Sequence, residues 1–257
     1  IGQSSGAQSL GSSSNENQYQ IDGTNISATP WVAGDVVEQV EVVQLGASAQ
    51  YGNVQGAVFN IVTRQGSNIM RGDANFYYQN KSLTGRNTTA EYDNGRPYYR
   101  DAYRDFTIQS AGAFVPNKFW YFGSFEHLVD YDAQPGADPR FPALNDARKV
   151  FWKFNYNINA KHRLMHGYHD DFYWIPGTPT LFTAPETISL SHGHNPTPNF
   201  VYTPTLSDRL VMEARYSGFF LQSSSDPNQP GAARVGTRVE NDDTGAITGA
   251  ISSWSEN

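Results

Sequence analysis

Apolar and polar residues alternate one by one along two long stretches of the chain. Between Lys149 and Ile158 every even-numbered residue is apolar or aromatic, and all but one of the odd-numbered residues are polar. Leu210–Leu221 shows a similar period. Because successive side chains of a strand point to opposite faces, both stretches are predicted to be β-strands with one apolar face.

Further segments after Asn68 show the same period less regularly. They are Ala74–Gln79, Asp105–Phe114, Phe119–Leu128, Arg163–Phe172 and Asn199–Thr205. All of the predicted strands are about 8–12 residues long, which is the length that a tilted membrane-spanning strand requires.

The connections between these strands alternate between short and long. Tight turns are predicted at 116–118, 159–162 and 206–208, and long connections rich in Pro, Gly, Asp and Asn near 80–104, 129–148, 173–198 and from 222 onward. This alternation is typical of an outer-membrane β-barrel, in which periplasmic turns are short and extracellular loops are long. A soluble β-sandwich has no reason to sort its loops by length.

Shorter β-like runs precede Asn68. Strands are predicted at Tyr19–Gly23, where the strand enters a turn, at Val36–Val43 and at Ala57–Thr63, although Val36–Gln39 also fits a short helix. The glycines between them suit turns that need positive φ or close backbone approach. Residues 1–18 are rich in Gly, Ser, Gln and Asn and fit a flexible or surface segment.

The composition favours the same class of fold. Hydrophobic residues make up 38% of the chain, whereas aromatic residues reach 14%, with 15 Tyr and 15 Phe. Apolar content is therefore concentrated in aromatic rings, which suits barrel strands with aromatic girdles. A soluble Tyr-rich β-sandwich remains the alternative.

Charge, cysteine content and hydropathy exclude several classes of protein. The net charge is −7 without a basic run, so nucleic acid is not expected as a partner. The absence of Cys excludes a thiolate nucleophile, a Cys-ligated metal and a disulfide scaffold. No run approaches the roughly 18 apolar residues of a membrane helix. The chain begins at Ile1 without a signal peptide, which indicates either that one was removed or that this is not the true beginning.

Enzyme chemistry finds no support in the motifs. The chain has neither a nucleophile-elbow sequence nor a Gly-rich phosphate loop with Lys, so we expect no enzyme and no cofactor. His192 and His194 are weak metal-ligand candidates in a long loop, with exposed histidines as the alternative. Asp170-Asp171 and Asp242-Asp243 are Ca²⁺ candidates or simply solvated loop charges. In a strand, His162 and His166 share a face and His169 does not.

Aromatic and arginine residues in the predicted loops are the best ligand-binding candidates. Such side chains stack on ligands and donate hydrogen bonds to them. The alternative is an interfacial aromatic girdle at the strand ends. The candidates are Tyr92, Arg96, Tyr98, Tyr99, Arg100 and Tyr103 in the first long loop, with Trp174 leading into the third.

With these residues in view, the sequence resembles the TonB-dependent receptor family along most of its length. Ile21-Asp22-Gly23 resembles a turn of the plug domain, and Val37–Val42 resembles a plug strand. Residues 46–63 resemble the glycine-rich signature that closes the plug. The order and spacing of these pieces make the resemblance specific. The matching plug positions are Asp22, Gly23, Glu38, Glu41, Gly46, Tyr51, Gly52, Gly56, Asn60 and Thr63.

Downstream motifs resemble one subgroup of that family. Gly66-Ser67-Asn68, Trp120–Glu126 and Asn159–Arg163 carry this second resemblance. Members of the subgroup have a carboxypeptidase-regulatory-like β-sandwich ahead of the plug. Nothing in the chain resembles a TonB box, and the predicted strands are too few to close a barrel of roughly 22 strands. The chain is therefore expected to be a fragment, or to cover only part of a larger protein.

The resemblance implies an all-β dominated fold: a small α/β plug followed by part of an antiparallel transmembrane β-barrel. We expect residues 1–68 to be the C-terminal part of the plug and residues 69–257 to be about seven barrel strands with long extracellular loops. The implied function is import of a ligand (metal chelate, glycan or peptide) across the bacterial outer membrane. The implied partners are the energy-transducing TonB complex, outer-membrane lipid or lipopolysaccharide, and an unknown small ligand. The alternatives are a surface scaffold or adhesion protein and a soluble β-rich binding module.

Overall fold

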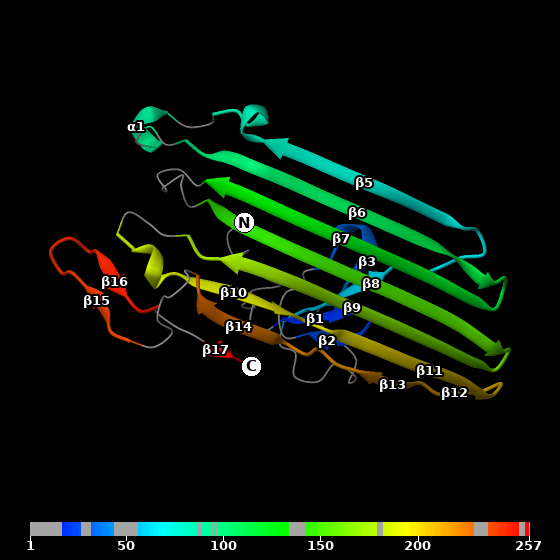
Figure 1. Cartoon of the computed structure of the whole chain (residues 1–257). Helices are drawn as coiled ribbons and strands as arrows, with labels where there is room; N and C mark the ends of the chain where they lie inside the picture. The colour runs from blue at the N-terminus through cyan, green and yellow to red at the C-terminus, as the bar shows by residue number, and fades with distance from the viewer. Residues whose placement is uncertain are drawn as a thin grey trace.

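The protein folds into two β-sheets of very different size (Figure 1). The computed structural model describes residues 17–26, 32–43, 56–86, 89–93, 95, 97–133, 142–178, 182–228, 236–251 and 255–256. Within these residues one sheet has four strands, another has eleven, and a two-stranded hairpin stands apart.

The large sheet is antiparallel, and its longest strands follow one another in chain order (Figure 1). Its described strands do not close on themselves, because β5 and β17 form two free edges. The strands are β5 (Arg71–Asn80), β6 (Tyr99–Val115), β7 (Phe119–Ala133), β8 (Ala143–Asn159), β9 (His162–Pro176), β10 (Ser189–His194), β11 (Thr197–Ser207), β12 (Leu210–Val211), β13 (Ala214–Ser217), β14 (Gln222–Pro227) and β17 (Ser255–Glu256).

The small sheet has the order β2-β1-β4-β3. Its strands are β1 (Gln18–Ile21), β2 (Thr24–Ile26), β3 (Val37–Val43) and β4 (Val58–Thr63). β1 pairs in parallel with β4, and the other pairs are antiparallel. The register between β3 and β4 shifts at Glu38, which marks a β-bulge. The predicted strands in this region are thus confirmed, and the helical alternative holds only for the single turn Gly34–Val36 ahead of β3.

The remaining elements are short. They are the 3-10 helices η2 (Gly34–Val36), η3 (Lys81–Leu83) and η4 (Pro185–Thr187), the helical turn α1 (Ala90–Asp93), and the hairpin β15 (Arg238–Glu240) with β16 (Ile247–Gly249). None of the helices in the described ranges is long and apolar enough to cross a membrane.

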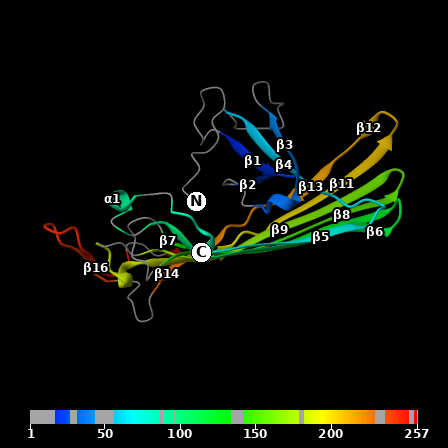
Figure 2. The same cartoon turned by 90° about the horizontal axis from the view of Figure 1, so that it is seen from above.

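The two sheets are stacked, with the small sheet on one side of the large one (Figure 2). We call the covered side the inner face and the opposite side the outer face. Directly paired residues of neighbouring strands point to the same side, and side chains alternate along each strand. Phe122, Phe151 and Lys153 lie on the inner face and are buried. The intervening Val150 and Trp152 lie on the outer face, as the alternation predicted.

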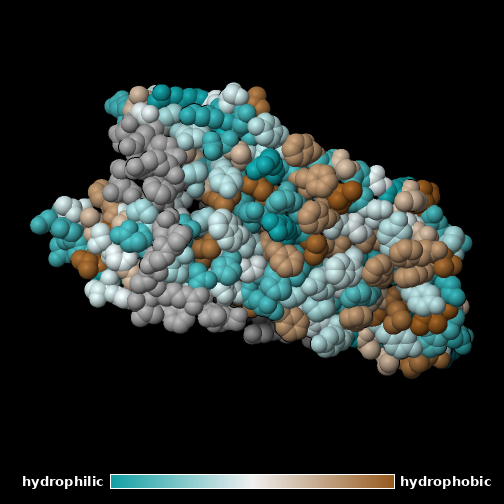
Figure 3. Space-filling view, in the orientation of Figure 1, coloured by the Kyte–Doolittle hydropathy of each residue, from teal (hydrophilic) through white to brown (hydrophobic). Residues whose placement is uncertain are grey.

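The outer face carries a continuous layer of aromatic rings. Phe114 contacts Tyr121 with ring centroids 4.6 Å apart, and His166 stacks on Phe200 at 4.1 Å. Figure 3 shows apolar side chains gathered over the half of this face nearest the short turns. We call this layer the outer aromatic band; it comprises Phe114, Phe119, Tyr121, Trp152, Phe154, Tyr156, His166, Tyr168 and Phe200.

The inner face carries charged and polar residues that are deeply buried. Lys149 and Glu126 form an ion pair at 2.9 Å with side chains only 7% and 9% exposed. Large apolar residues of the outer face are by contrast open to the surroundings, including Phe114 at 58% and Phe200 at 48% exposure. A soluble sandwich has the opposite arrangement, whereas a membrane barrel has an apolar outside and a polar inside.

The observed strands are longer than predicted. β6 to β9 have 15 to 17 residues, against the expected 8–12. The extra residues lie beyond the outer aromatic band, where Arg104, His127 and Arg148 take the outward positions. The outward side of these extensions mixes charged residues with apolar ones such as Val129, Leu144 and Trp174, so the sequence shows no regular alternation there.

The prediction of one strand over Leu210–Leu221 is wrong. The structure has two short strands there, β12 and β13, separated by Met212 and Glu213. The neighbouring chain contains Pro196, Pro198 and Pro204, and proline has no N–H to donate to a ladder. At these prolines hydrogen bonds form in one direction only, from an N–H of the 210–221 segment to the proline carbonyl, as from the Met212 N–H to the Pro204 carbonyl at 3.0 Å. The chain therefore stays alongside β11 without continuous pairing.

Candidate functional site at the interface between the two sheets

Asp22 is the main polar connection between the two sheets. It ends β1 and, with Gly23, forms a turn in which both residues have positive φ, 47° and 76°. Asp and Gly tolerate this left-handed backbone. The Asp22 carboxylate accepts hydrogen bonds from the Thr63 N–H at 3.0 Å and the Thr63 hydroxyl at 2.5 Å. The turn is thereby fixed to the end of β4.

Lys153 on the inner face of β8 completes this arrangement. Its Nζ lies 3.0 Å from the Asp22 carboxylate, and both side chains are almost fully buried, at 8% and 9% exposure. The same ammonium donates to the Thr63 hydroxyl at 3.1 Å and to the Thr63 carbonyl at 3.3 Å. A buried ion pair needs good geometry and further hydrogen bonds to offset the cost of desolvation, and this pair has both. We call Asp22, Thr63 and Lys153 the latch.

Two further side chains of the large sheet reach the backbone of the same turn. Asn199 Nδ2 of β11 donates to the Asp22 carbonyl at 3.1 Å, and an Arg215 guanidinium N–H donates to the same oxygen at 2.6 Å. A Cβ added at Gly23 would overlap that guanidinium. Glycine at this position therefore serves both the left-handed turn and the close approach of Arg215.

An apolar cluster lies beside the latch. Val36 of η2 is fully buried, and it belongs to one cluster with Ala33, Phe122 and Phe151. Phe122 and Phe151 are inner-face residues of β7 and β8, with ring centroids 5.7 Å apart. The small sheet is thus held by both apolar packing and buried hydrogen bonds.

The segment between the sheets is fixed to the first short turn. Asn68 Oδ1 accepts from the Asn117 N–H at 2.8 Å and from the Trp120 indole N–H at 2.7 Å. Gly66 passes so close to the backbone of β6 and β7 that an added Cβ would lie within 3.0 Å of atoms of Gly112 and Tyr121. This connection is anchored at Gly66 and Asn68 to the large sheet, which we call the wall.

Replacing Gly66 with Ala should therefore destabilise the protein by about 1–3 kcal/mol, since backbone atoms on the wall cannot move aside as a flexible side chain can. Urea unfolding in lipid vesicles measures the change. Gly85→Ala is the matched control, because nothing lies within 4 Å of its added Cβ. Equal stability of the two variants would contradict the close packing at Gly66.

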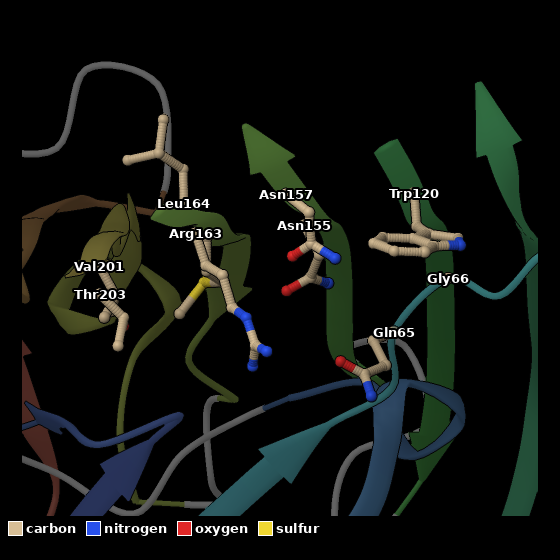
Figure 4. Close-up of a pocket in the computed structure, with 10 residues that line it drawn as sticks. Gln65, Gly66, Trp120, Asn155, Asn157, Arg163, Leu164, Val201 and Thr203 are labelled. Atoms are coloured by element: carbon tan, nitrogen blue, oxygen red, sulfur yellow. The ribbon is translucent and has the colours of Figure 1, made fainter. Parts of the chain in front are cut away.

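A pocket lined by both polar and apolar residues opens beside this connection (Figure 4). Its volume is about 380 Å³. Arg163 extends between Asn155 and Asn157 on one side and Thr203 on the other, and Trp120 closes the far end (Figure 4). Gln65 and Gly66 form the boundary toward the small sheet.

The residues that match the plug motif are partly brought together. Asn60 Oδ1 accepts from the Gly23 N–H at 2.9 Å, and Asn60 Nδ2 donates to Glu41 at 3.0 Å. Asp22 and Thr63 belong to the latch. Glu38 occupies the bulge of β3 and is exposed, and Gly56 lies just before β4. Gly46, Tyr51 and Gly52 fall outside the described residues.

The loop candidates for ligand binding do not form one cluster. Arg100 pairs with Asp130 at 3.0 Å and lies over the Tyr103 ring at 4.5 Å, so its charge is already balanced. Tyr98 and Tyr99 stand at the start of β6, and Tyr92 on α1 is 84% exposed. Trp174 pairs with outward-facing Asp146 and so lies on the outer face. Arg96 lies outside the described residues.

His192 and His194 are in strand β10, not in a loop as the sequence predicted. The strand has no apolar alternation, and its register with β9 is set by pairing with Phe172 and Trp174. His192 contacts Asp226 at 2.9 Å, and His194 contacts Asp170 at 3.1 Å. In the described part of the chain, no three His, Asp or Glu side chains are grouped to hold a metal ion.

The aspartate candidates differ in exposure. Asp170 is 1% exposed and also accepts from the Tyr168 hydroxyl at 2.9 Å, and Asp171 accepts from Asn195. Asp242 and Asp243 are exposed in the turn of the β15–β16 hairpin.

The sequence did not single out Lys153, Asn199 or Arg215 as partners of Asp22. The only available signal was the placement of Lys153 on the polar side of its strand.

The outward apolar band, the polar inner face and the alternation of short turns with long connections define an outer-membrane type of β-sheet protein. The resemblance to TonB-dependent receptors is supported by one relative in sequence and by one solved structure in fold. The TonB-dependent transporter Oar of Myxococcus xanthus is 23% identical over 82% of this chain. The crystal structure of the siderophore receptor PirA from Acinetobacter baumannii covers 96% of the chain with a TM-score of 0.62 and 11% identity.

The chain spans 23% of the length of the first relative and 36% of the second. No family model matches it. The relatives are named as a transporter and a receptor rather than as enzymes, which agrees with the motif analysis. The structural likeness to PirA concerns the fold alone.

Proposed function

We propose that this protein imports a ligand across the bacterial outer membrane through a plugged β-barrel. In this proposal residues 1–68 belong to the plug and residues 69–257 to the barrel wall. The observation that carries it is the latch: a small sheet is fixed by a few buried polar contacts to the inner face of a sheet whose outside is apolar. Such contacts can be broken and remade when an energised partner pulls on the plug.

The division near residue 68 is supported by the connection between the sheets. β4 ends at Thr63, and β5 begins at Arg71, with Gly66 and Asn68 anchored to the wall between them. A plug attached in this way can be displaced while the first barrel strand keeps its place.

The position of the outer aromatic band supports one orientation of the protein in the membrane. The band begins at the short turns and ends before Arg104, His127 and Arg148, beyond which the strands continue toward the long connections. We propose that the short turns face the periplasm and the long connections the cell surface. Arg104 and Arg148 at this border of the band then lie where lipopolysaccharide phosphates would be.

The proposed ligand site lies at the loop end of the inner face. Tyr103 presents its ring and hydroxyl group there beside Arg100, which holds the large sheet together through Asp130, whereas Tyr99 pairs with outward-facing Ala133. A metal chelate, a glycan and a peptide all fit such chemistry. Energy would come from the TonB complex, which the family resemblance implies as a partner.

Locking the small sheet to the wall is expected to abolish uptake. The chain has no native Cys, so an Arg64→Cys, Gln109→Cys pair is labelled specifically. The ends of the native side chains at these positions approach to 3.5 Å, so a bis-thiosulfonate reagent with a spacer that replaces the length of both side chains joins the two thiols. Growth of the strain with the cross-linked protein on iron chelates, cobalamin or oligosaccharides is compared with growth of a deletion strain. Reduction of the disulfides that hold the linker should restore growth.

The same assay separates transport from the scaffold alternative. A surface scaffold needs no plug movement, so the locked protein would leave every growth phenotype of the wild type intact. The unlinked double-cysteine protein is the control for the substitutions themselves. If the deletion strain grows like wild type on all ligands, import of these ligand classes is rejected.

A further inference from the structure

A small cavity lies beside the latch, between the small sheet and the large one. Its volume is about 10 Å³, close to the least that holds one water molecule. Thr24 of β2 borders it from the small sheet, and His169 of β9 and Asn199 of β11 border it from the wall. The cavity therefore spans the interface rather than either sheet alone.

Four buried polar atoms around this cavity have no hydrogen-bond partner in the protein. These atoms are the Thr24 hydroxyl, the Asn199 Oδ1 and both imidazole nitrogens of His169. Thr24 is 1% exposed, and His169 and Asn199 are each 4% exposed. Buried polar groups without partners are unfavourable, and three of them around one cavity are rarely retained unless something bridges them.

We infer that this cavity binds a single ordered water molecule that bridges the two sheets. Water donates two hydrogen bonds and accepts two, and here it meets a hydroxyl, an amide oxygen and an imidazole nitrogen. A cation fits less well, because the nearby Asp22 carboxylate is already bound by Lys153 and Thr63. The site thus suits a neutral ligand with both donors and acceptors.

The water connects directly to the latch. Asn199 Nδ2 donates a hydrogen bond to the Asp22 carbonyl at 3.1 Å. The Oδ1 of the same amide group has no partner in the protein, so this one side chain connects the cavity to Asp22. A bridging water molecule changes its hydrogen-bond partners more easily than a side chain does, because it is small and is not attached to the chain. The contact can therefore re-form after the sheets separate, whether or not the protein transports a ligand.

A double-mutant cycle on Thr24→Val and His169→Leu tests this inference in the intact protein. The readout is native-state hydrogen exchange of the β2 amides, residues 24–26. Each single variant is expected to speed exchange roughly tenfold, because the water loses a partner. The double variant should also give about tenfold rather than a hundredfold, since both substitutions remove the same bridge.

Packing alone also couples neighbouring residues, so a second cycle is needed as a control. Ile21→Val with Phe151→Leu alters two apolar residues that border the same cavity and have no polar group at stake. Coupling in the Thr24–His169 cycle well above that of the control cycle supports the bridge, as does water density in a high-resolution structure. Purely multiplicative effects, or a metal peak in anomalous scattering, would overturn it.

Discussion

Lys153→Met is expected to release the small sheet from the wall. The substitution leaves the Asp22 carboxylate buried at 9% exposure with hydrogen bonds from Thr63 but without a counter-charge. Removing one partner of a buried ion pair costs about 3–5 kcal/mol. At 1.4 kcal/mol per tenfold, hydrogen exchange of the β1 and β4 amides should accelerate by on the order of a hundredfold or more.

The double variant Asp22→Asn, Lys153→Met should recover part of this loss, because no unpaired buried charge remains. Lys149→Met is the matched control. Lys149 and Glu126 are equally buried, yet both belong to the wall, so this variant should weaken β7 and β8 without affecting exchange in β1 and β4. If Lys153→Met leaves exchange in β1 and β4 at the wild-type rate, the latch does not hold the small sheet.

Phe154→Arg should destabilise the large sheet by about 2–4 kcal/mol, the cost of an arginine on the lipid face near the middle of a membrane strand. Phe154 lies midway along the apolar part of β8 and contacts the rings of Phe114, Phe119 and His166. Urea unfolding in lipid vesicles measures the loss, and loss of heat-resistant migration in gels provides a second reading.

Asn155→Arg is the control at nearly the same depth. The adjacent residue points to the inner face and borders the pocket shown in Figure 4, which has room for a longer side chain. We expect a change below about 1 kcal/mol, because lumen substitutions in membrane barrels are tolerated. An equal loss in both variants would mean that the two faces of β8 do not differ in environment.

The strand faces could be predicted from the sequence because their signal is local. In Lys149–Ile158 the two-residue period alone places Trp152 and Phe154 on one side and Lys153 on the other, and the structure agrees. The turn at Asp22-Gly23 was similarly readable, because few residues other than Gly, Asp and Asn adopt its left-handed backbone.

The failures share a physical cause, since each depends on a partner distant in the sequence. Lys153 pairs with a residue 131 positions away, and no local pattern encodes that contact. The pairing of Leu210–Leu221 is interrupted by prolines in the neighbouring strand. His192 lies in a short strand in which Leu190 is the one large apolar residue, so apolar alternation gave no sign of it.

The parallel pairing of β1 with β4 has a mechanical consequence. A force applied to the chain ahead of Gln18 pulls β1 along its own axis, while the wall anchors at Gly66 and Asn68 hold β4 from its opposite end. Parallel strands loaded from opposite ends are sheared, so all four registered residue pairs between Gln18–Ile21 and Val58–Ile61 bear the load together. The small sheet then withstands traction as one rigid body, and the first contacts to rupture are those that dock it to the wall.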